Sequence, residues 1–170
     1  MPNYCNNQAT FNHASSYRIE QVLNAANSNT LFNTFVPINN NDADHDDNLD
    51  PRDVWGCKWE ASEIVVMNKS DDSITLYFDT PWAPPIAFYE AMEELGFTVE
   101  AYYWEPGMNF CGEFVDGNDF EYHVERNYVP PQIDAVFNIE EQLEEWYVDN
   151  MEEVERFVYE GSKILEEQNG

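Results

Sequence analysis

Apolar and polar positions alternate with two different periods along the first 125 residues, and these periods predict a mixed α and β structure. Stretches rich in β-branched and aromatic residues predict strands at 3–12, 62–67, 73–78, 98–104, 109–115 and 120–125. Apolar residues three or four positions apart predict helices from Ser15 or Ser16 to about residue 29, and from Thr80 to residue 95. This order predicts an α+β fold: a ferredoxin-like split βαβ antiparallel sheet with helices on one face, plus a β-hairpin extension at 109–125.

The remaining segments carry weaker or different patterns. Residues 31–38 are apolar but contain Pro37, which predicts an irregular or short extended segment, and residues 39–53 form a polar, acidic loop. Beyond Pro130 and Pro131, apolar residues recur at helical spacing from 139 to 167, which predicts one long acidic amphipathic helix with its weakest point at Gly161. We therefore expect an α+β domain at 1–130 and a helical extension at 131–170. The apolar stripe of the extension either packs on the sheet of the same chain, or forms a homodimer or receives a partner protein.

The charge balance changes this otherwise ordinary picture. The 170 residues include 34 Asp and Glu against 7 Lys and Arg, a formal net charge of -27. Direct binding to nucleic acid or to an anionic membrane needs clustered cations, so both are excluded and a basic partner is favoured. No apolar run approaches the roughly 20 residues that span a bilayer, and the first residues lack a signal-peptide pattern, so we expect a cytoplasmic protein.

The acidic residues gather in two regions, which are the candidate partner-binding sites. One is the loop, with Asp42, Asp44, Asp46 and Asp47; the other is the C-terminal helix, with Glu140, Glu141, Glu144, Glu145, Asp149, Glu152 and Glu153. Like charges three or four residues apart on a helix reduce its stability, which suggests that they serve a purpose beyond solubility. Duplex DNA carries one charge per about 1.7 Å, so the chain matches the charge of roughly 13 base pairs. The pattern predicts a DNA mimic, and a merely solvated acidic face is the alternative.

The loop also resembles a calcium-binding register. Acidic or amide residues fall at positions 1, 3, 5, 7, 9 and 12 of a loop that runs from Asp42 to Asp53. Asp47 stands where glycine makes the sharp turn, and Asp53 replaces the bidentate glutamate. These departures favour a solvated loop over a calcium site.

Two tryptophan-containing blocks form the alternative ligand site. Trp55, Lys58 and Trp59 occur in the first block and Trp82 in the second. Lys58 either stacks on a tryptophan or pairs with Glu60, and the blocks either cement the sheet or bind a small anionic or planar ligand such as a nucleotide.

Catalytic and metal-binding patterns are weak. Cys5, Cys57, Cys111 and His123 include the right ligand types for zinc, but each lies in a different predicted element. The cysteines are far apart and odd in number, which suggests reduced thiols, and no activated nucleophile is marked. We therefore expect a protein that is not an enzyme and needs no cofactor.

Several blocks resemble a known family. They are Cys5–Asn7, Phe32–Ile38, Trp55–Ala61, Phe78–Pro85 and Phe110–Gly112, and together they resemble the YubB-like, phage Api-type ferredoxin-like domain family of phages and plasmids. Cys57 stands where that family usually has Thr, and Glu60 where it has Asp. The resemblance implies a ferredoxin-like fold and a mobile-element protein without an established catalytic activity.

Charge and resemblance combine into one hypothesis. We expect a phage- or plasmid-encoded, non-catalytic protein that inhibits a basic host protein or nucleoprotein complex, such as a restriction, CRISPR or other defence nuclease, by DNA-mimic electrostatics. The alternative is a small-molecule or nucleotide-binding module built on the tryptophan blocks.

Overall fold

The computed structural model describes residues 3–38, 49–125, 128–151 and 153–169. The chain divides into two compact units, Met1–Val124 and Glu125–Gly170. Within the described ranges, no helix has both the length and the apolar character needed to cross a membrane.

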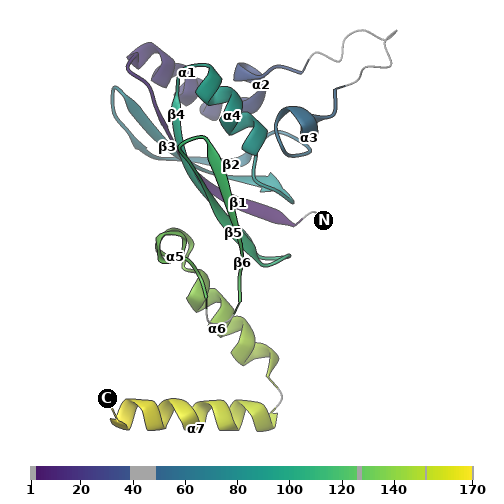
Figure 1. Cartoon of the computed structure of the whole chain (residues 1–170), viewed down its shortest axis with the longest axis vertical. Coiled ribbons are helices and arrows are strands. Elements are labelled where there is room, and N and C mark those ends of the chain that lie inside the picture. The colour runs from purple at the N-terminus through teal and green to yellow at the C-terminus, as the bar shows by residue number, and fades with distance from the viewer. Residues whose placement is uncertain (1–2, 39–48, 126–127, 152, 170) are drawn as a thin grey trace. The chain divides into compact units, whose positions relative to one another are not determined.

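The first unit is an α+β unit built on one antiparallel sheet (Figure 1). Its strands are β1 (Tyr4–Asn12), β2 (Ser62–Lys69), β3 (Ser73–Pro81), β4 (Thr98–Glu105), β5 (Phe110–Val115) and β6 (Asn118–His123). The strand order across the sheet is β2-β3-β1-β4-β5-β6. The helices are α1 (Ser16–Asn27), α2 (Leu31–Phe35), α3 (Pro51–Val54) and α4 (Ile86–Glu94). The predicted α+β class, the predicted strands and the first long helix of this unit are confirmed. The second predicted helix begins at Ile86 rather than at Thr80, because Thr80 and Pro81 end strand β3.

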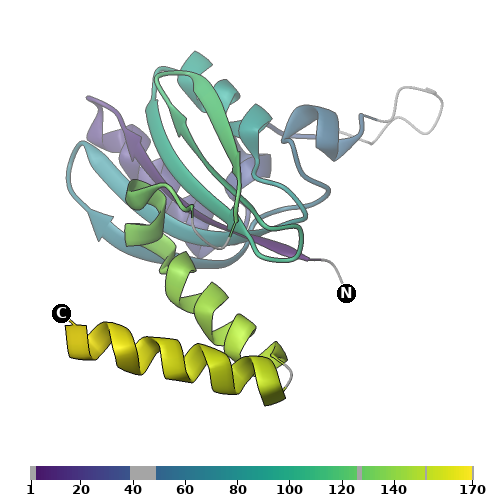
Figure 2. The same cartoon turned by 60° about the horizontal axis from the view of Figure 1, so that its bottom comes forward.

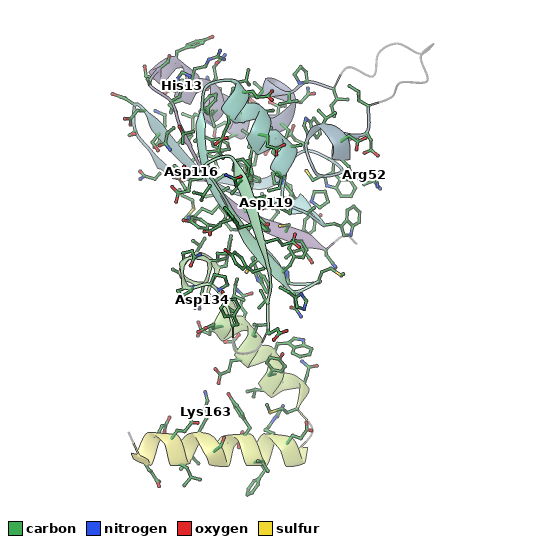
Figure 3. All side chains as sticks on the ribbon, viewed as in Figure 1. His13, Arg52, Asp116, Asp119, Asp134 and Lys163 are labelled. Carbon is green, nitrogen blue, oxygen red and sulfur yellow. The ribbon has the colours of Figure 1, made fainter. Side chains whose placement is uncertain are left out.

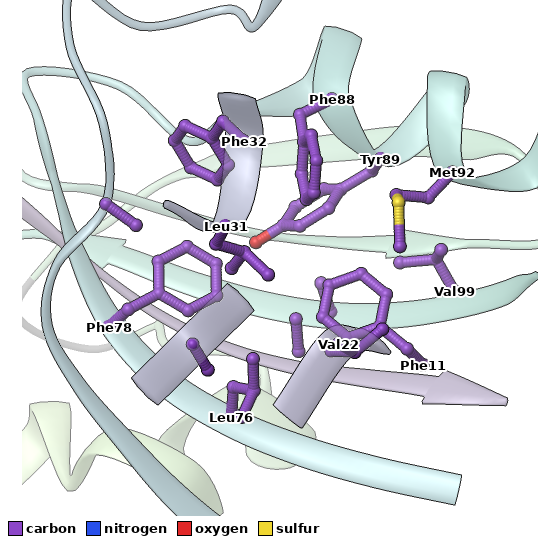
Figure 4. Packing of buried hydrophobic residues seen from close by; sticks show 14 of the residues in the cluster. Phe11, Val22, Leu31, Phe32, Leu76, Phe78, Phe88, Tyr89, Met92 and Val99 are labelled. Carbon is purple, nitrogen blue, oxygen red and sulfur yellow. The ribbon is translucent and has the colours of Figure 1, made fainter. Parts of the chain in front are cut away.

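The core lies between the sheet and the helices on one of its faces. Alternate residues of β1 are buried, including Ala9 and Phe11, because successive side chains of a strand point to opposite faces. Figures 1 and 2 show α1 and α4 on the same face of the sheet. Aromatic rings fill the space between the layers (Figure 4), and the ring centroids of Phe32 and Phe88 lie 4.5 Å apart. Burial of these large rings is the main stabilising contribution to the unit.

Residues 31–35 form the helix α2, so the prediction of an irregular or extended segment is wrong. The carboxylate of Glu60 accepts hydrogen bonds from the backbone N–H groups of Phe32 (2.7 Å) and Asn33 (3.0 Å) at the start of this helix. These donors have no partner inside a helix, and a carboxylate is their best acceptor. A residue 28 positions away in the sequence therefore stabilises α2.

The outer strand β2 is irregular. Its pairing with β3 shifts register between Ser62 and Val65 and again between Val66 and Asn68. Val65, Val66 and Met67 are exposed. Such irregularities interrupt the row of backbone groups that a sheet edge presents.

The hairpin of β5 and β6 depends on a glycine. Gly112 lies opposite Tyr103 in the pairing of β5 with β4, and the buried Tyr103 ring crosses over it. The Tyr103 hydroxyl donates a 2.7 Å hydrogen bond to Asp119 on β6. Asp119 is labelled in Figure 3. Burial raises the pKa of Asp119, and the hydrogen bond from Tyr103 opposes that rise.

The second unit contains α5 (Pro131–Phe137), α6 (Ile139–Asn150) and α7 (Glu153–Asn169). The sequence predicts a single helix over 139–167, but Met151 has an extended backbone with φ -70° and ψ 139°. Figure 2 shows α6 and α7 as separate helices. The prediction of one long helix is wrong, and the break lies at residue 151 rather than at Gly161, which is inside α7.

Candidate functional site

Trp55, one of the four predicted ligand-site residues, belongs to the core. Its side chain is 7% exposed, and its indole Nε1 donates a 2.8 Å hydrogen bond to the carbonyl oxygen of Val36. Its ring centroid lies 5.6 Å from that of Phe32. The indole faces and the N–H group are therefore occupied inside the unit, and Trp55 is not available to a ligand.

The other three predicted residues come together at the surface. The ring centroids of Trp59 and Trp82 are 5.4 Å apart, and the ring planes meet at 62°. The Lys58 ammonium lies 5.5 Å from both centroids. Trp59 is 38% exposed and Trp82 is 44% exposed. We call Lys58, Trp59 and Trp82 the tryptophan corner.

Two loops hold the tryptophan corner in place. Gly56 has φ +90°, and a Cβ atom at this position would lie 2.9 Å from the backbone nitrogen of Ile86, so the first loop packs closely on the start of α4. The backbone N–H of Phe88 donates to the carbonyl of Trp55 at 3.2 Å, and the thiol of Cys57 donates to the carbonyl of Trp59 at 3.4 Å. These contacts fix the 55–59 loop against the segment that follows Trp82.

Trp82 has a left-handed backbone, with φ +62°. This conformation is uncommon for a bulky residue and costs about 1 to 3 kcal/mol. The Trp82 N–H donates a 2.8 Å hydrogen bond to the carbonyl of Asn3, which helps to keep the conformation. Glycine would adopt this backbone without strain, whereas tryptophan adopts it at an energetic cost although 44% of its surface stays exposed.

Glu60 does not pair with Lys58, contrary to one of the two predicted alternatives. Its carboxylate accepts from the backbone N–H groups of Phe32 and Asn33, and from its neighbour Ala61 at 3.1 Å. Burial raises the pKa of Glu60, and the three backbone N–H groups oppose that rise. The other alternative, stacking of Lys58 on tryptophan, is confirmed.

The acidic partner-binding residues are placed in part. Asp42, Asp44, Asp46, Asp47 and Glu152 lie outside the described residues, and Glu153 begins α7 without a described side chain. The other five predicted residues are exposed on α6: Glu140, Glu141, Glu144, Glu145 and Asp149. Glu144 receives hydrogen bonds from Lys163 and from the Tyr159 hydroxyl, both on α7 (Figure 3). Glu141 accepts from the side-chain amide of Asn138.

The described end of the acidic loop has an internal partner. Asp50 accepts a 2.9 Å hydrogen bond from the backbone N–H of Arg52 at the start of α3 and also pairs with the Arg52 guanidinium. These contacts lower the pKa of Asp50 to about 2. Asp50 therefore caps a helical turn in the described part of the predicted calcium register.

The cysteines do not assemble into a metal site. Cys111 pairs with Trp104 while its sequence neighbour Gly112 pairs with Tyr103, so Cys111 projects from the sheet face opposite to that of Tyr103. Across the described ranges, no group of three or more His, Cys, Asp and Glu residues could hold a metal ion.

The thiols are also poor nucleophiles. Burial raises the pKa of Cys57 to about 12 and that of Cys111 to about 11. Burial likewise raises the pKa of Cys5, and Glu105 adds to that rise. A thiol with a raised pKa stays protonated at neutral pH and does not attack a substrate.

Part of the apolar stripe predicted for the C-terminal segment lies at the surface of α7. Four large apolar residues of α7 are exposed: Phe157, Val158, Ile164 and Leu165. Their helical spacing predicts an amphipathic helix, but the same pattern fits a buried helix face, so spacing alone does not reveal that they are exposed.

Comparisons with known proteins give little. No protein-family model matches the chain. No curated protein matches it either. The crystal structure of a protein api92 from Yersinia pseudotuberculosis, assigned to family DUF1281, is similar to part of the chain with 18% identity and a TM-score of 0.34. The match covers 46% of this chain and 30% of that chain, and at this level the likeness decides neither fold nor function.

Proposed function

We propose that the chain is a non-catalytic binding protein that uses the carboxylates of α6 to occupy a basic, nucleic-acid-binding surface of another protein. The observation that carries this proposal is the composition of α6, which has five exposed acidic residues and no basic residue among its 12 positions. Helices that are merely soluble commonly alternate acidic and basic residues, because such pairs stabilise the helix. The absence of compensation in α6 favours a cationic partner.

The spacing of the carboxylates supports a comparison with a nucleic acid backbone. Glu141, Glu145 and Asp149 follow one another every four residues, and Glu140 and Glu144 form a second row beside them. Four residues of helix advance about 6 Å. In the described ranges, Glu144 has an ion pair with Lys163, whereas Glu140, Glu141, Glu145 and Asp149 have none. Four of the five carboxylates therefore remain without a paired cation.

A basic partner is favoured over a second copy of the chain. Residues 139–169 carry eleven acidic and two basic residues, a net charge of -9. Two such segments repel each other, whereas a cationic groove attracts them and accelerates association at low salt. The exposed apolar residues of α7, such as Phe157 and Val158, would add apolar contact with that partner.

The proposal also includes where the chain is encoded, on a phage or plasmid, and which class of host protein it binds. The strand order β2-β3-β1-β4, with α1 and α4 on one face, supports a ferredoxin-like topology extended by β5 and β6. Together with the resemblance of the tryptophan blocks, this favours a phage- or plasmid-encoded protein that acts in the host cytoplasm. The proposed target is a restriction, CRISPR or other defence nuclease, whose DNA-binding groove has the required charge.

Competition with DNA tests the proposal. Purified restriction and CRISPR nucleases are incubated with labelled duplex DNA and increasing amounts of the chain, across a salt series. We expect the wild type to displace DNA from at least one of them at low salt. Replacing Glu141, Glu145 and Asp149 with Lys should weaken this effect by tenfold or more, about 1.4 kcal/mol.

The matched control reverses three exposed glutamates in the first unit: Glu63, Glu90 and Glu94. It changes the net charge by the same amount and should retain displacement. Equal losses in both variants would show that total charge, rather than α6, causes the inhibition. Displacement that is insensitive to salt would contradict the electrostatic mechanism.

Binding of a small anionic or planar ligand, such as a nucleotide, is the second candidate function. Lys58, Trp59 and Trp82 lie together at the surface and would form the site, with the Lys58 ammonium as the group that attracts the anion. It has less support than the first candidate because Trp55 is buried and the Lys58 ammonium already lies between two indole rings. A nucleotide present at 100 times its dissociation constant should stabilise the chain by about 2.7 kcal/mol in a thermal-shift assay.

A further inference from the structure

The tryptophan corner has the geometry of a site for an organic cation. The faces of aromatic rings carry negative potential, and a cation within about 6 Å of a ring centroid is attracted to them. Trp59 and Trp82 meet at 62°, so two ring faces can act on one cationic group, and the Lys58 ammonium lies 5.5 Å from both. The same faces repel an anion, and rings at this angle cannot sandwich a planar base.

Lys58 lacks the carboxylate partner that would otherwise explain its position. The nearest acidic residue in the sequence, Glu60, directs its carboxylate to three backbone N–H groups instead. No ion pair of Lys58 occurs within the described residues. Asp50, whose pKa Lys58 helps to lower, has its ion pair with Arg52. The two indole rings are therefore the direct partners of the ammonium among the described residues.

The backbone of Trp82 provides an independent indication. Its left-handed conformation, φ +62°, is strained for tryptophan, and its ring is 44% exposed. The strain is therefore accepted for a side chain that keeps nearly half of its surface in contact with solvent. Strained residues with exposed side chains are characteristic of binding sites, where the side chain is kept for its contacts with a ligand.

We propose that Trp59 and Trp82 form a binding site for an organic cation, an alkylammonium or guanidinium group, and that Lys58 occupies this site until an external cation displaces it. Lys58 is tethered next to the site, so it competes at a high effective concentration and weakens the apparent affinity for any external cation. That the natural cation is an Arg or Lys side chain of a basic partner rests on the proposed function. The site itself does not, because small cations can test it without the partner.

The experiment titrates the full chain with choline and monitors the indole N–H resonances by NMR spectroscopy. We expect the resonances of Trp59 and Trp82 to shift. The Lys58→Gln variant should bind choline about threefold more tightly than the wild type, because choline no longer has to displace the Lys58 ammonium and one exposed cation–π contact changes affinity by about this factor. Trp55 serves as the buried control and should not shift. Trp146, 59% exposed on the acidic helix α6, reports non-specific attraction of cations to the acidic chain.

A neutral isostere and a second cation complete the design. 3,3-Dimethyl-1-butanol has the shape of choline without its charge and should bind more weakly; equal binding would overturn the proposal, because it would indicate an ordinary apolar patch. Unchanged or weaker choline binding in Lys58→Gln would overturn the role of Lys58. Equal shifts of Trp146 and Trp82 would overturn the proposal, because they would show that the cation is attracted non-specifically to the acidic chain.

Comparison of two cations identifies the preferred group. Tighter binding of ethylguanidinium than of choline would identify an Arg side chain as the preferred group, and tighter binding of choline would identify a quaternary ammonium compound.

Discussion

Replacing Gly112 with Ala should destabilise the first unit severely. A Cβ atom at this position would lie 2.2 Å from both Cζ and the hydroxyl oxygen of Tyr103, and 2.5 Å from the carbonyl oxygen of Phe120. Contacts between carbon atoms are most favourable at about 3.5 to 4.0 Å, so the ring must move by more than 1 Å. That movement breaks the 2.7 Å hydrogen bond between Tyr103 and Asp119. The Phe120 carbonyl belongs to the β5–β6 hairpin and cannot retreat without distorting it.

The magnitude follows from two contributions. Overpacking a buried site costs about 1 to 3 kcal/mol, and the loss of a hydrogen bond to a charged acceptor costs about 1.5 to 3 kcal/mol. Their sum, about 2.5 to 6 kcal/mol, is a large share of the 5 to 15 kcal/mol that stabilises a typical domain. Urea denaturation followed by circular dichroism measures the loss, and with a slope of about 1 to 3 kcal/mol/M the midpoint should fall by about 0.8 M or more.

Two further variants make the test specific. A Cβ atom at Gly161 in α7 has nothing within 4 Å, so Gly161→Ala should cause no loss of stability. In a Tyr103→Val background the ring is absent and only the contact with the Phe120 carbonyl remains, so Gly112→Ala should cost less than it does in the wild type. An equal cost in both backgrounds, or a cost below about 1 kcal/mol in the wild type, would refute the close approach of Tyr103 to Gly112.

Two other predictions concern Asp119 and Glu60, carboxylates whose pKa is raised by partial removal from solvent. Burial raises the pKa of Asp119 in the folded state, so the folded chain binds this proton more tightly than the unfolded chain, and the associated stability is lost as pH rises above about 4. Asp119→Asn should therefore flatten the fall in urea midpoint between pH 4 and pH 7, and an unchanged slope would contradict the raised pKa of this carboxyl. Glu60→Ala leaves the buried backbone N–H groups of Phe32 and Ala61 without an acceptor and should cost about 2 to 4 kcal/mol in urea denaturation. The exposed control Glu90→Ala should stay within about 0.5 kcal/mol of the wild type.

The strands and long helices of the first unit could be predicted because apolar residues recur along each of them at the spacing typical of a strand or of a helix. Helix α2 could not, because the carboxylate that caps it belongs to Glu60, 28 residues further along the chain. A local pattern contains no information about such a partner. The break at Met151 was also missed, because the apolar spacing continues across it and no glycine or proline marks it.

The sequence predicted which residues belong to the tryptophan-containing site, but it did not predict which of them are buried and which are exposed. Trp55 and Trp59 belong to the same short block, yet one is buried against Phe32 and the other is exposed beside Trp82. A loop has no period that would assign residues to an inner or an outer face, so only the fold distinguishes them. The residue types in the sequence identified Lys58, Trp59 and Trp82 as a possible cluster. Only the fold shows that the Lys58 ammonium lies against both indole rings.

The irregular edge at β2 has a consequence for the behaviour of the chain in concentrated solution. A sheet edge with three exposed apolar residues, Val65, Val66 and Met67, is a template on which another molecule could add a strand and begin a fibril. The two register shifts in this strand interrupt that template, because an incoming straight strand would lose its hydrogen bonds at each shift. Together with mutual repulsion between chains of charge -27, they should keep the protein dispersed at concentrations where a regular edge would polymerise.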